Sequence, residues 1–234
     1  MYKNLYNIFS DRWIHNGKVF IYSDPHFSDV ESYTFRELLN DDTTVEELDE
    51  MQIKNINSLV GSDDTIIFLG DIGNIECIKK IKGYKVLILG NHDKGASYYK
   101  REVVEKFNNE DMSFGDRLKM QDALFSHDFE SINNVMKRYT KQIDNNLFDE
   151  VYEGPLMISN KVILSHEPIE VEEYMFNIHG HRHDLVADYD ENHLHLNVCA
   201  EAINYIPVCL QDLIKNGLIK HIKDIHRYTI DKRD

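Results

Sequence analysis

Residues of the types that bind metal ions come where short apolar segments of the sequence end. The residues concerned, including those of one later loop, are Asp24, His26, Asp71, Asn74, Asn91, His92, His166, His181 and His183. Carboxylate and amide oxygens together with imidazole nitrogens suit first-row divalent metal ions. The sequence therefore indicates a site for a divalent metal ion.

Each of these motifs, taken alone, is more typical of ordinary turn chemistry. An Asp-x-His pair is commonly a solvated turn, and a Gly-Asp pair after a strand commonly starts one. Their joint occurrence at the ends of successive strands is what favours metal binding, because side chains at strand ends gather around one site. Gly70, Gly90 and Gly180 fit this interpretation, since glycine lets the chain turn sharply or approach a ligand closely.

The elements that must position these residues alternate in the first half of the chain. Apolar runs rich in β-branched residues predict buried strands. Helical spacing of apolar residues, or a capping signal, predicts helices in the segments between these strands. The predicted strands are 18–23, 65–70 and 85–90, and the predicted helices are 43–60, 75–81 and 97–107. Thr44 and Glu47 form an expected capping box at the first helix. This alternation predicts a layered α/β fold whose sheet is largely buried.

The second half has mostly strand signals. We expect strands at 152–159, 161–165, 175–180, 194–199 and 203–210, followed by a short helix that ends at Gly217. These strands are predicted to form the second sheet of a sandwich. The sequence contains no repeat, low-complexity stretch or linker, so residues 1–234 are expected to form a single domain.

In order along the chain, the motifs are D-x-H at 24–26, G-D-x-x-N at 70–74, G-N-H-D at 90–93, a lone histidine at 166 and G-H-x-H at 180–183. This series resembles the signature of the calcineurin-like metallophosphoesterases, in particular small bacterial and phage members. The resemblance implies an α/β (α+β) fold in which two mixed sheets form a β-sandwich flanked by helices. That is the four-layer architecture of the metallophosphatases.

The resemblance also implies two metal positions that share one carboxylate. Asp24, His26, Asp71 and His183 would hold one ion, and Asp71, Asn91, His166 and His181 the other. Two ions about 3.5 to 4 Å apart activate a shared hydroxide and clamp the phosphoryl oxygens. The implied cofactors are two divalent ions, with Mn²⁺ preferred and Fe, Zn, Ni or Co as alternatives. The implied activity is that of a hydrolase acting on a small phosphoester, with a phosphodiester preferred.

His92 is the expected catalytic side chain. In the family this histidine faces the scissile group, where it protonates the leaving oxygen or stabilises charge on the phosphoryl group. Many relatives orient it with an aspartate at the position of Asn74. An amide would orient the ring but favour its protonated form less, which predicts a preference for diesters over monoesters. Asp93 is expected to bond its local backbone in a turn.

Other histidines and an arginine have simpler interpretations. His127 also follows an apolar run, but His166 lies nearer to the Gly-His-Arg-His loop and is the preferred ligand. His193 and His195 alternate with leucines, which predicts the polar face of a strand. Arg182 is expected to be a solvated loop residue.

Charge and cysteine content limit the partners. The chain has 26 Lys and Arg residues against 41 Asp and Glu residues, a net charge of −15. This charge disfavours long nucleic acids, and therefore a nuclease. A non-catalytic scaffold of the same fold is the other alternative. Cys77, Cys199 and Cys209 form no disulfide pattern, and the sequence shows no signal peptide or membrane segment, so a cytoplasmic location is expected.

Residues 108–150 are longer than an α/β connection usually requires. We hypothesise that this insertion forms a cap over the metal site. Within it, the segment 131–148 has helical spacing of Val135, Tyr139 and Ile143. The basic side chains expected to bind the remote part of the substrate are Lys137, Arg138 and Lys141.

Overall fold

The computed structural model describes residues 17–39, 43–99, 104–107, 112–126, 128, 131, 135, 140–143 and 147–223. The chain forms two compact units. Residues 1–100 and 147–234 make up the first, and residues 101–146 make up the second. The predicted insertion of 108–150 thus overlaps a separate unit with somewhat different boundaries. Within the described ranges, no helix is both long and apolar enough to cross a membrane.

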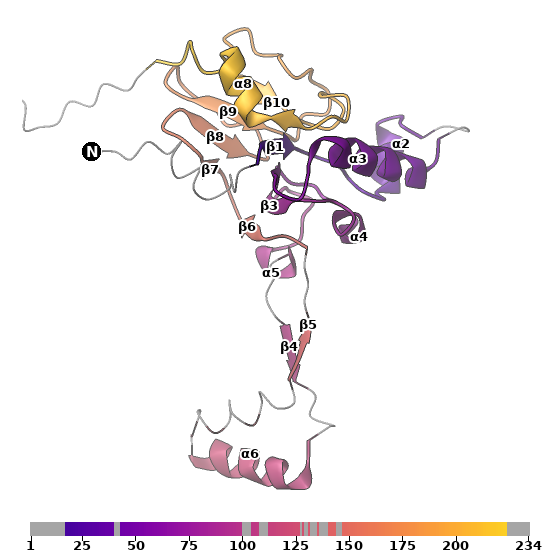
Figure 1. The fold of residues 1–234 in the computed structure, drawn as a ribbon, viewed down its shortest axis with the longest axis vertical. Coiled ribbons are helices and arrows are strands. Elements are labelled where there is room, and N and C mark those ends of the chain that lie inside the picture. The colour runs from indigo at the N-terminus through magenta and orange to yellow at the C-terminus, as the bar shows by residue number, and fades with distance from the viewer. Residues whose placement is uncertain are drawn as a thin grey trace, which may run out of the picture. The chain divides into compact units, whose positions relative to one another are not determined.

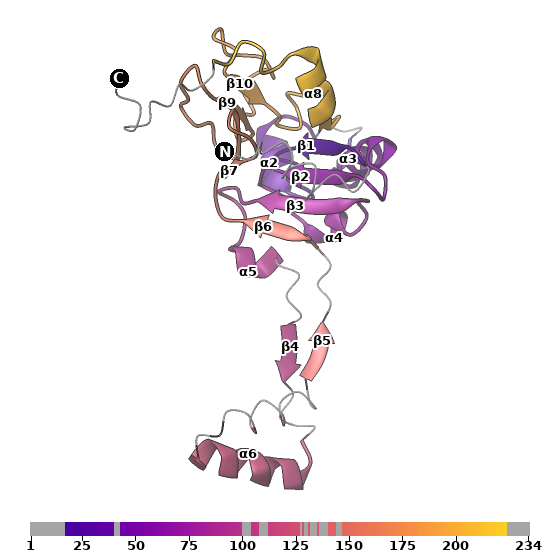
Figure 2. The same cartoon turned by 60° about the vertical axis from the view of Figure 1, so that its left-hand side comes forward.

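The first unit contains a five-stranded mixed sheet (Figures 1 and 2). Its strands, in spatial order, are β11 (Val208–Cys209), β1 (Val19–Tyr22), β2 (Thr65–Phe68), β3 (Tyr84–Ile88) and β6 (Glu150–Tyr152). All neighbours run parallel except β11, which is antiparallel to β1. Parallel strands end at the same edge of a sheet, so the segments after β1, β2 and β3 converge.

The first unit also contains a four-stranded mixed sheet. Its spatial order is β10 (His195–Asn197), β9 (Phe176–His179), β8 (Val162–Ser165) and β7 (Leu156–Met157). The first three are parallel, and β7 is antiparallel to β8. The fold is therefore mixed α/β with two mixed sheets and helices.

Two predicted second-sheet strands were wrongly assigned. The segment 152–159 divides between β6 in the first sheet and β7 in the second, and β11 of the segment 203–210 joins the first sheet. Both β6 and β11 form edges of the first sheet. An edge strand satisfies backbone N–H and C=O groups that would otherwise be unpaired, which alternation along the sequence does not reveal.

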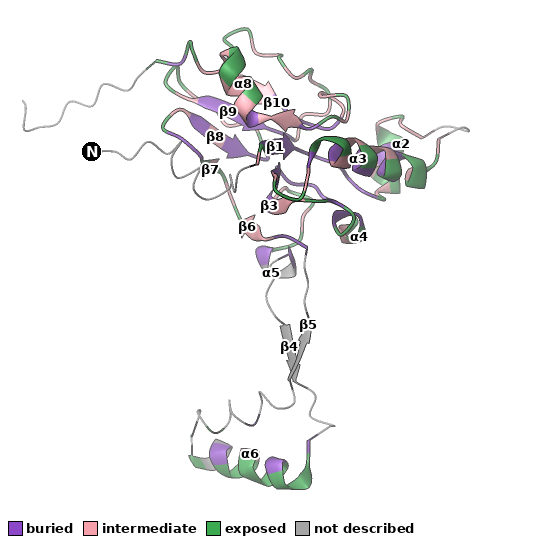
Figure 3. Cartoon of the chain, in the orientation of Figure 1, coloured by how far each residue is buried: buried purple, intermediate pink, exposed green. Residues whose placement is uncertain are grey.

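Alternating side chains of the first sheet enter two different cores. Phe20 and Tyr22 point into a core shared with helices α3 (Val45–Leu59) and α4 (Ile75–Ile78). Val19 and Ile21 point into a core shared with the second sheet. Both faces are therefore buried, as the continuous apolar strands predict. Figure 3 shows the central strands as buried and the outer faces of the helices as exposed.

Short helices flank the first sheet. They are α2 (Val30–Phe35), α3 (Val45–Leu59), α4 (Ile75–Ile78), α5 (Ala96–Tyr99) and α8 (Leu210–Asn216). The capping box of α3 is confirmed, since the Glu47 N–H donates to Thr44 Oγ1 at 3.2 Å and the Thr44 N–H donates to Glu47 Oε2 at 2.9 Å. Gly217, in the left-handed conformation with φ 100°, ends α8 as predicted.

The second unit contains β4 (Val104–Phe107), α6 (Phe114–Ser126) and β5 (Thr140–Ile143). The predicted helix 97–107 was wrong at Val104–Phe107, because this segment forms β4 and pairs with β5 instead. The helix predicted over 131–148 was wrong at Thr140–Ile143, where strand pairing overrides the helical spacing, whereas Ser131 and Val135 are helical. Lys137, Arg138 and Tyr139 lie outside the described residues, and the cap hypothesis stays a prediction.

Removal of the α3 cap should destabilise the first unit. We expect Thr44→Ala to lower the free energy of unfolding by about 1 kcal/mol, because the Glu47 N–H loses its acceptor. Thr44→Ser keeps the hydroxyl and should unfold like the wild type. Urea unfolding followed by circular dichroism measures both variants, and equal stability of the two would contradict the capping role.

Candidate metal centre

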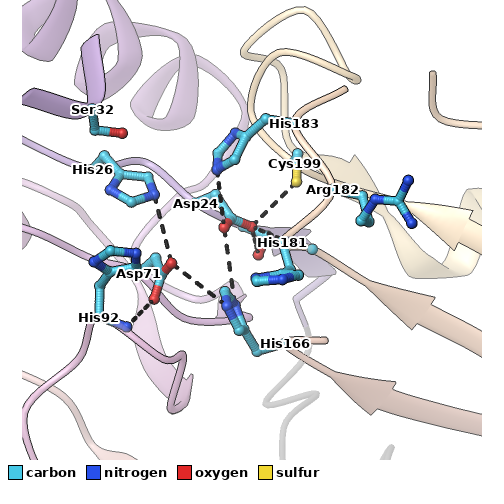
Figure 4. A network of polar contacts seen from close by, with 12 residues as sticks. Asp24, His26, Ser32, Asp71, His92, His166, His181, Arg182, His183 and Cys199 are labelled. Carbon is cyan, nitrogen blue, oxygen red and sulfur yellow. Dashed lines mark hydrogen bonds and ion pairs between the residues drawn. The ribbon is translucent and has the colours of Figure 1, made fainter. Parts of the chain in front are cut away.

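The predicted metal ligands converge from both sheets. Asp24, Asp71 and Asn91 come after β1, β2 and β3, while His166 follows β8 and His181 follows β9. Figure 4 shows the imidazoles of the labelled histidines arranged around the carboxylates of Asp24 and Asp71. The parallel order of the strands explains this convergence, because their carboxyl ends meet at common edges.

Four of these residues have an unusual backbone conformation. Asp24, His26, Asp71 and His181 have φ of 56°, 45°, 51° and 67°. The left-handed region is sparsely populated by residues other than glycine, and each instance costs on the order of 1 to 3 kcal/mol. Neighbouring loops hold the strained turns in place, since the His26 N–H donates to Asp71 O at 3.0 Å. Such strain is typical of functional sites.

The first group of ligand atoms comprises those of Asp24, His26 and His183, which lie within 4.8 Å of one another. Asp24 Oδ1 is 3.5 Å from His183 Nε2. Among the residues that the structure describes, neither Asp24 Oδ1 nor His26 Nε2 has a hydrogen-bond partner, and both atoms are buried. Because buried polar atoms are nearly always satisfied, these two atoms fit a bound cation.

The second group contains Asp24, Asp71 and His166 within the same 4.8 Å limit. Asp71 Oδ2 lies 3.5 Å from His166 Nε2 and 3.6 Å from His26 Nε2, so this oxygen faces both groups. Asn91 Oδ1 lies 2.7 Å from His166 Nε2 and 3.1 Å from His181 Nδ1. The structure thus brings all seven predicted ligands together, with Asp24 in both groups and Asp71 of the second group facing His26 of the first.

Hydrogen bonds orient the Asp24 carboxylate. Its Oδ2 accepts hydrogen bonds from Ser23 Oγ, from the His181 N–H at 2.9 Å and from Cys199 Sγ at 3.3 Å. Oδ1 is left facing His183 and His166. One oxygen is therefore held by the protein, while the other is available to a cation.

Burial keeps two of the imidazoles neutral. Burial lowers the pKa of His183 to about 4, although Asp24 opposes this shift. Burial, and next the Arg36 guanidinium, lower the pKa of His26. A neutral imidazole keeps a lone pair for coordination, so protons compete little with a metal at neutral pH.

His92 lies at the edge of this cluster. Its backbone N–H donates to Asp71 Oδ1 at 2.9 Å. Its exposed imidazole makes an edge contact with the ring of His26, with 5.6 Å between the ring centroids. Among the described residues, no hydrogen-bond partner of the His92 ring is present. The ring is consequently free to meet a substrate that enters the centre.

Asn74 does not orient His92, contrary to prediction. Its Oδ1 accepts from the Glu76 N–H at 3.0 Å as the N-cap of α4, and its Nδ2 donates to Ser28 Oγ at 3.2 Å. The competing principle is helix capping, which uses the short amide side chain at the start of α4.

Asp93 contributes more than the local turn that its sequence position predicts. Its Oδ2 accepts from the Gly90 N–H at 2.8 Å and from the Asp71 N–H at 2.9 Å, and its Oδ1 accepts from the Ile72 N–H at 3.0 Å. Asp93 thus joins the loop after β3 to the loop after β2. It thereby fixes the backbone of Asp71 beside the loop that carries Asn91.

Sequence reasoning missed two carboxylates that contact the ligands. Asp29 Oδ2 lies 3.1 Å from His26 Nδ1, and Glu201 Oε2 lies 3.0 Å from His183 Nδ1. Asp29 also caps α2, a signal that its spacing to Ser32 offered. Glu201 carries no such local signal, because its partner is distant in sequence.

The remaining candidates lie apart from the cluster. Arg182 forms a bidentate pair with Asp184 at 2.9 and 3.1 Å, consistent with a loop arginine. His193 is exposed beside Asp188, while His195 is half-buried beside Asp190. His127 lies outside the described residues.

A cavity of about 340 Å³ adjoins the second group. Asn91 and His166 line it together with residues that include Glu153, Pro155 and Glu167. This volume falls in the range of small-molecule pockets, roughly 300 to 1,000 Å³. The ligand cluster therefore has an adjacent space for part of a small substrate.

Comparisons with known proteins support the fold only. No family model matches the chain. An uncharacterized protein of Methanocaldococcus jannaschii is 26% identical over 212 residues, which cover 85% of this chain and 90% of that protein. A crystal structure of an Aquifex aeolicus protein of unknown function is similar with a TM-score of 0.52 and 20% identity, covering 86% of this chain and 100% of that one.

The close approach at Gly180 gives a test of the site's geometry. A Cβ at this position would collide with Ser23 Oγ and Asp24 Oδ2, so Gly180→Ala should displace the carboxylate. We expect Mn²⁺ affinity to fall roughly tenfold or more. Titration calorimetry on metal-free protein measures this loss. Gly154→Ala is the control, since no atom lies within 4 Å of its Cβ. Equal affinities of the two variants would contradict the proposed packing.

Proposed function

We propose that this protein is a binuclear metal-dependent phosphoesterase of the calcineurin-like metallophosphoesterase type. The observation that carries the proposal is the cluster of seven side chains of ligand type, in which Asp24 Oδ1 and His26 Nε2 are buried and have no hydrogen-bond partner within the described part of the chain. A bound cation would satisfy both of these buried atoms.

In this proposal Asp71 is shared between two ions. Asp24, His26 and His183 complete one position, and the remaining ligands, Asn91, His166 and His181, complete the other. The mixed nitrogen and oxygen ligands suit manganese, with iron, zinc, nickel or cobalt as alternatives. Two such ions supply an activated water and neutralise charge on phosphoryl oxygens.

The protein's own groups would then handle the substrate. The exposed His92 ring lies beside His26, and in this proposal it donates a proton to the leaving oxygen. The cavity next to Asn91 and His166 would receive an ester arm. Its size and the net charge of −15 favour a small phosphodiester over a nucleic-acid polymer.

The same proposal includes the layered arrangement of the sheets and helices and the compartment of the cell in which the protein is located. We propose the four-layer arrangement of the metallophosphatases, supported by the face-to-face core of the two sheets and by α3 and α4 on the outer face of the first sheet. A cytoplasmic location is supported by the three free cysteines.

Variants of Asp71 and His92 should separate metal binding from catalysis. Asp71→Ala should remove both metal ions and all activity, because its carboxylate is shared. His92→Ala should keep two equivalents of metal and lose turnover. Elemental analysis and hydrolysis of bis(p-nitrophenyl) phosphate in Mn²⁺ measure these effects. Two retained equivalents in the Asp71 variant, or full activity in the His92 variant, would overturn the assignment.

We expect diesters to be hydrolysed in preference to monoesters. His92 has no hydrogen-bonded carboxylate among the described residues, and a monoester adds a charge to be accommodated. Because Asn74 caps α4 rather than bonding His92, Asn74→Asp should leave the diester-to-monoester ratio unchanged. The ratio of kcat/KM for the p-nitrophenyl diester and monoester tests this. A shift toward the monoester would restore a role for Asn74 beside His92.

A further inference from the structure

Two oppositely charged groups compete for one nitrogen of His183. Glu201 Oε2 lies 3.0 Å from His183 Nδ1, and Arg36 Nη1 lies 3.2 Å from the same atom. Arg36 and Glu201 also form an ion pair with each other. The side chains of Arg36 and Glu201 are 7% and 19% exposed, so solvent screens this network only weakly.

The choice between these partners decides which nitrogen carries the proton. If His183 Nδ1 donates to Glu201, Nε2 keeps a lone pair and faces Asp24 Oδ1 at 3.5 Å. If Nδ1 instead accepts from Arg36, the proton of the neutral ring must lie on Nε2. A protonated Nε2 cannot coordinate a cation, so only the first arrangement is competent.

We propose that Glu201 is a positioning residue that keeps the His183 proton on Nδ1 and thereby leaves Nε2 free for a metal ion. The inference rests on the proposed metal centre. Glu201 also occupies the guanidinium of Arg36, which would otherwise donate to Nδ1. Partners of this kind fix the tautomer and the orientation of ligating histidines and raise their basicity.

The segment that carries Arg36 is itself restrained. Arg36 Nε donates to Ser32 O at 3.1 Å, and the guanidinium lies 5.4 Å from the centre of the Tyr33 ring. The same segment bears Asp29, the partner of His26 Nδ1. Helix α2 and its caps therefore support both imidazoles of one metal position.

The second position has a different kind of support. His166 Nδ1 lies 2.7 Å from Leu69 O, a backbone carbonyl. A carbonyl accepts but never donates, so the His166 tautomer does not depend on Glu201. A change at Glu201 should consequently affect one of the two metal positions.

Nitrogen NMR of histidine tests the tautomer without metal or substrate. In the full-length, metal-free protein at pH 7.5, we expect His183 to carry its proton on Nδ1 in the wild type and on Nε2 in Glu201→Ala. Glu201→Ala combined with Arg36→Met removes the competing donor and should reduce the Nε2-protonated population. The NMR signals of His183 are assigned as those that are missing from the spectrum of the His183→Gln variant. An unchanged tautomer in folded Glu201→Ala would overturn the proposal.

Manganese titration provides the second readout. Glu201→Ala should lower the affinity for one of the two equivalents of Mn²⁺ by roughly 10- to 100-fold. Adding Arg36→Met to this variant should recover part of the lost affinity. Glu201→Gln covers the case in which the alanine variant does not fold. It should weaken the same equivalent by less, because its amide oxygen still accepts from Nδ1.

The matched control is Asp190→Asn, which alters a carboxylate 2.7 Å from His195 Nδ1, outside the ligand cluster. Asp190→Asn should leave the affinity for both equivalents of Mn²⁺ unchanged. Wild-type affinity in the Glu201 variants, or an equal loss in Asp190→Asn, would overturn the positioning role while leaving the metal centre intact. If wild-type protein binds no Mn²⁺, the proposed function fails and this inference with it.

Discussion

The burial of two carboxylates between the sheets is the constraint on which the structure of the site depends. Asp24 and Asp71 are 0% and 2% exposed. An isolated buried charge is strongly unfavourable unless it is paired or binds a metal. The surroundings stabilise both carboxylates. Backbone N–H groups donate to one side of each carboxylate, imidazoles lie on the other side, and glycine occurs where the chain segments approach most closely.

Chemical type at strand ends made the centre predictable. Asp24 and Asp71 follow the apolar strands β1 and β2, which are parallel neighbours whose carboxyl ends meet at one edge of the first sheet. His166 also follows an apolar run, but in the second sheet, so it reaches the other two only through the packing of the sheets. The capping box of α3 was also predictable from the sequence, because Thr44 and Glu47 lie three residues apart. Features that depend on short-range spacing or on common strand direction are therefore accessible from the sequence.

Partnerships between distant segments were not accessible in this way. Glu201 meets His183 and Arg36 only after the sheets have packed, and the β4–β5 pairing overrides a helical pattern. Asn74 had two plausible uses, and capping of α4 prevailed over contact with His92. Asp93 likewise bonds a neighbouring loop as well as its own. Tertiary context decides such competitions between local options.

The ligands come from both sheets, which has a consequence for the mechanical coherence of the fold. A cation held by Asp24 and His183 would tie together positions 24 and 183, far apart along the chain, much as a covalent cross-link does. Cross-links over long loops restrict the unfolded ensemble most. Chelation would then loosen the packing of the two sheets, and resistance to proteolysis would report on ion occupancy without the need for a substrate.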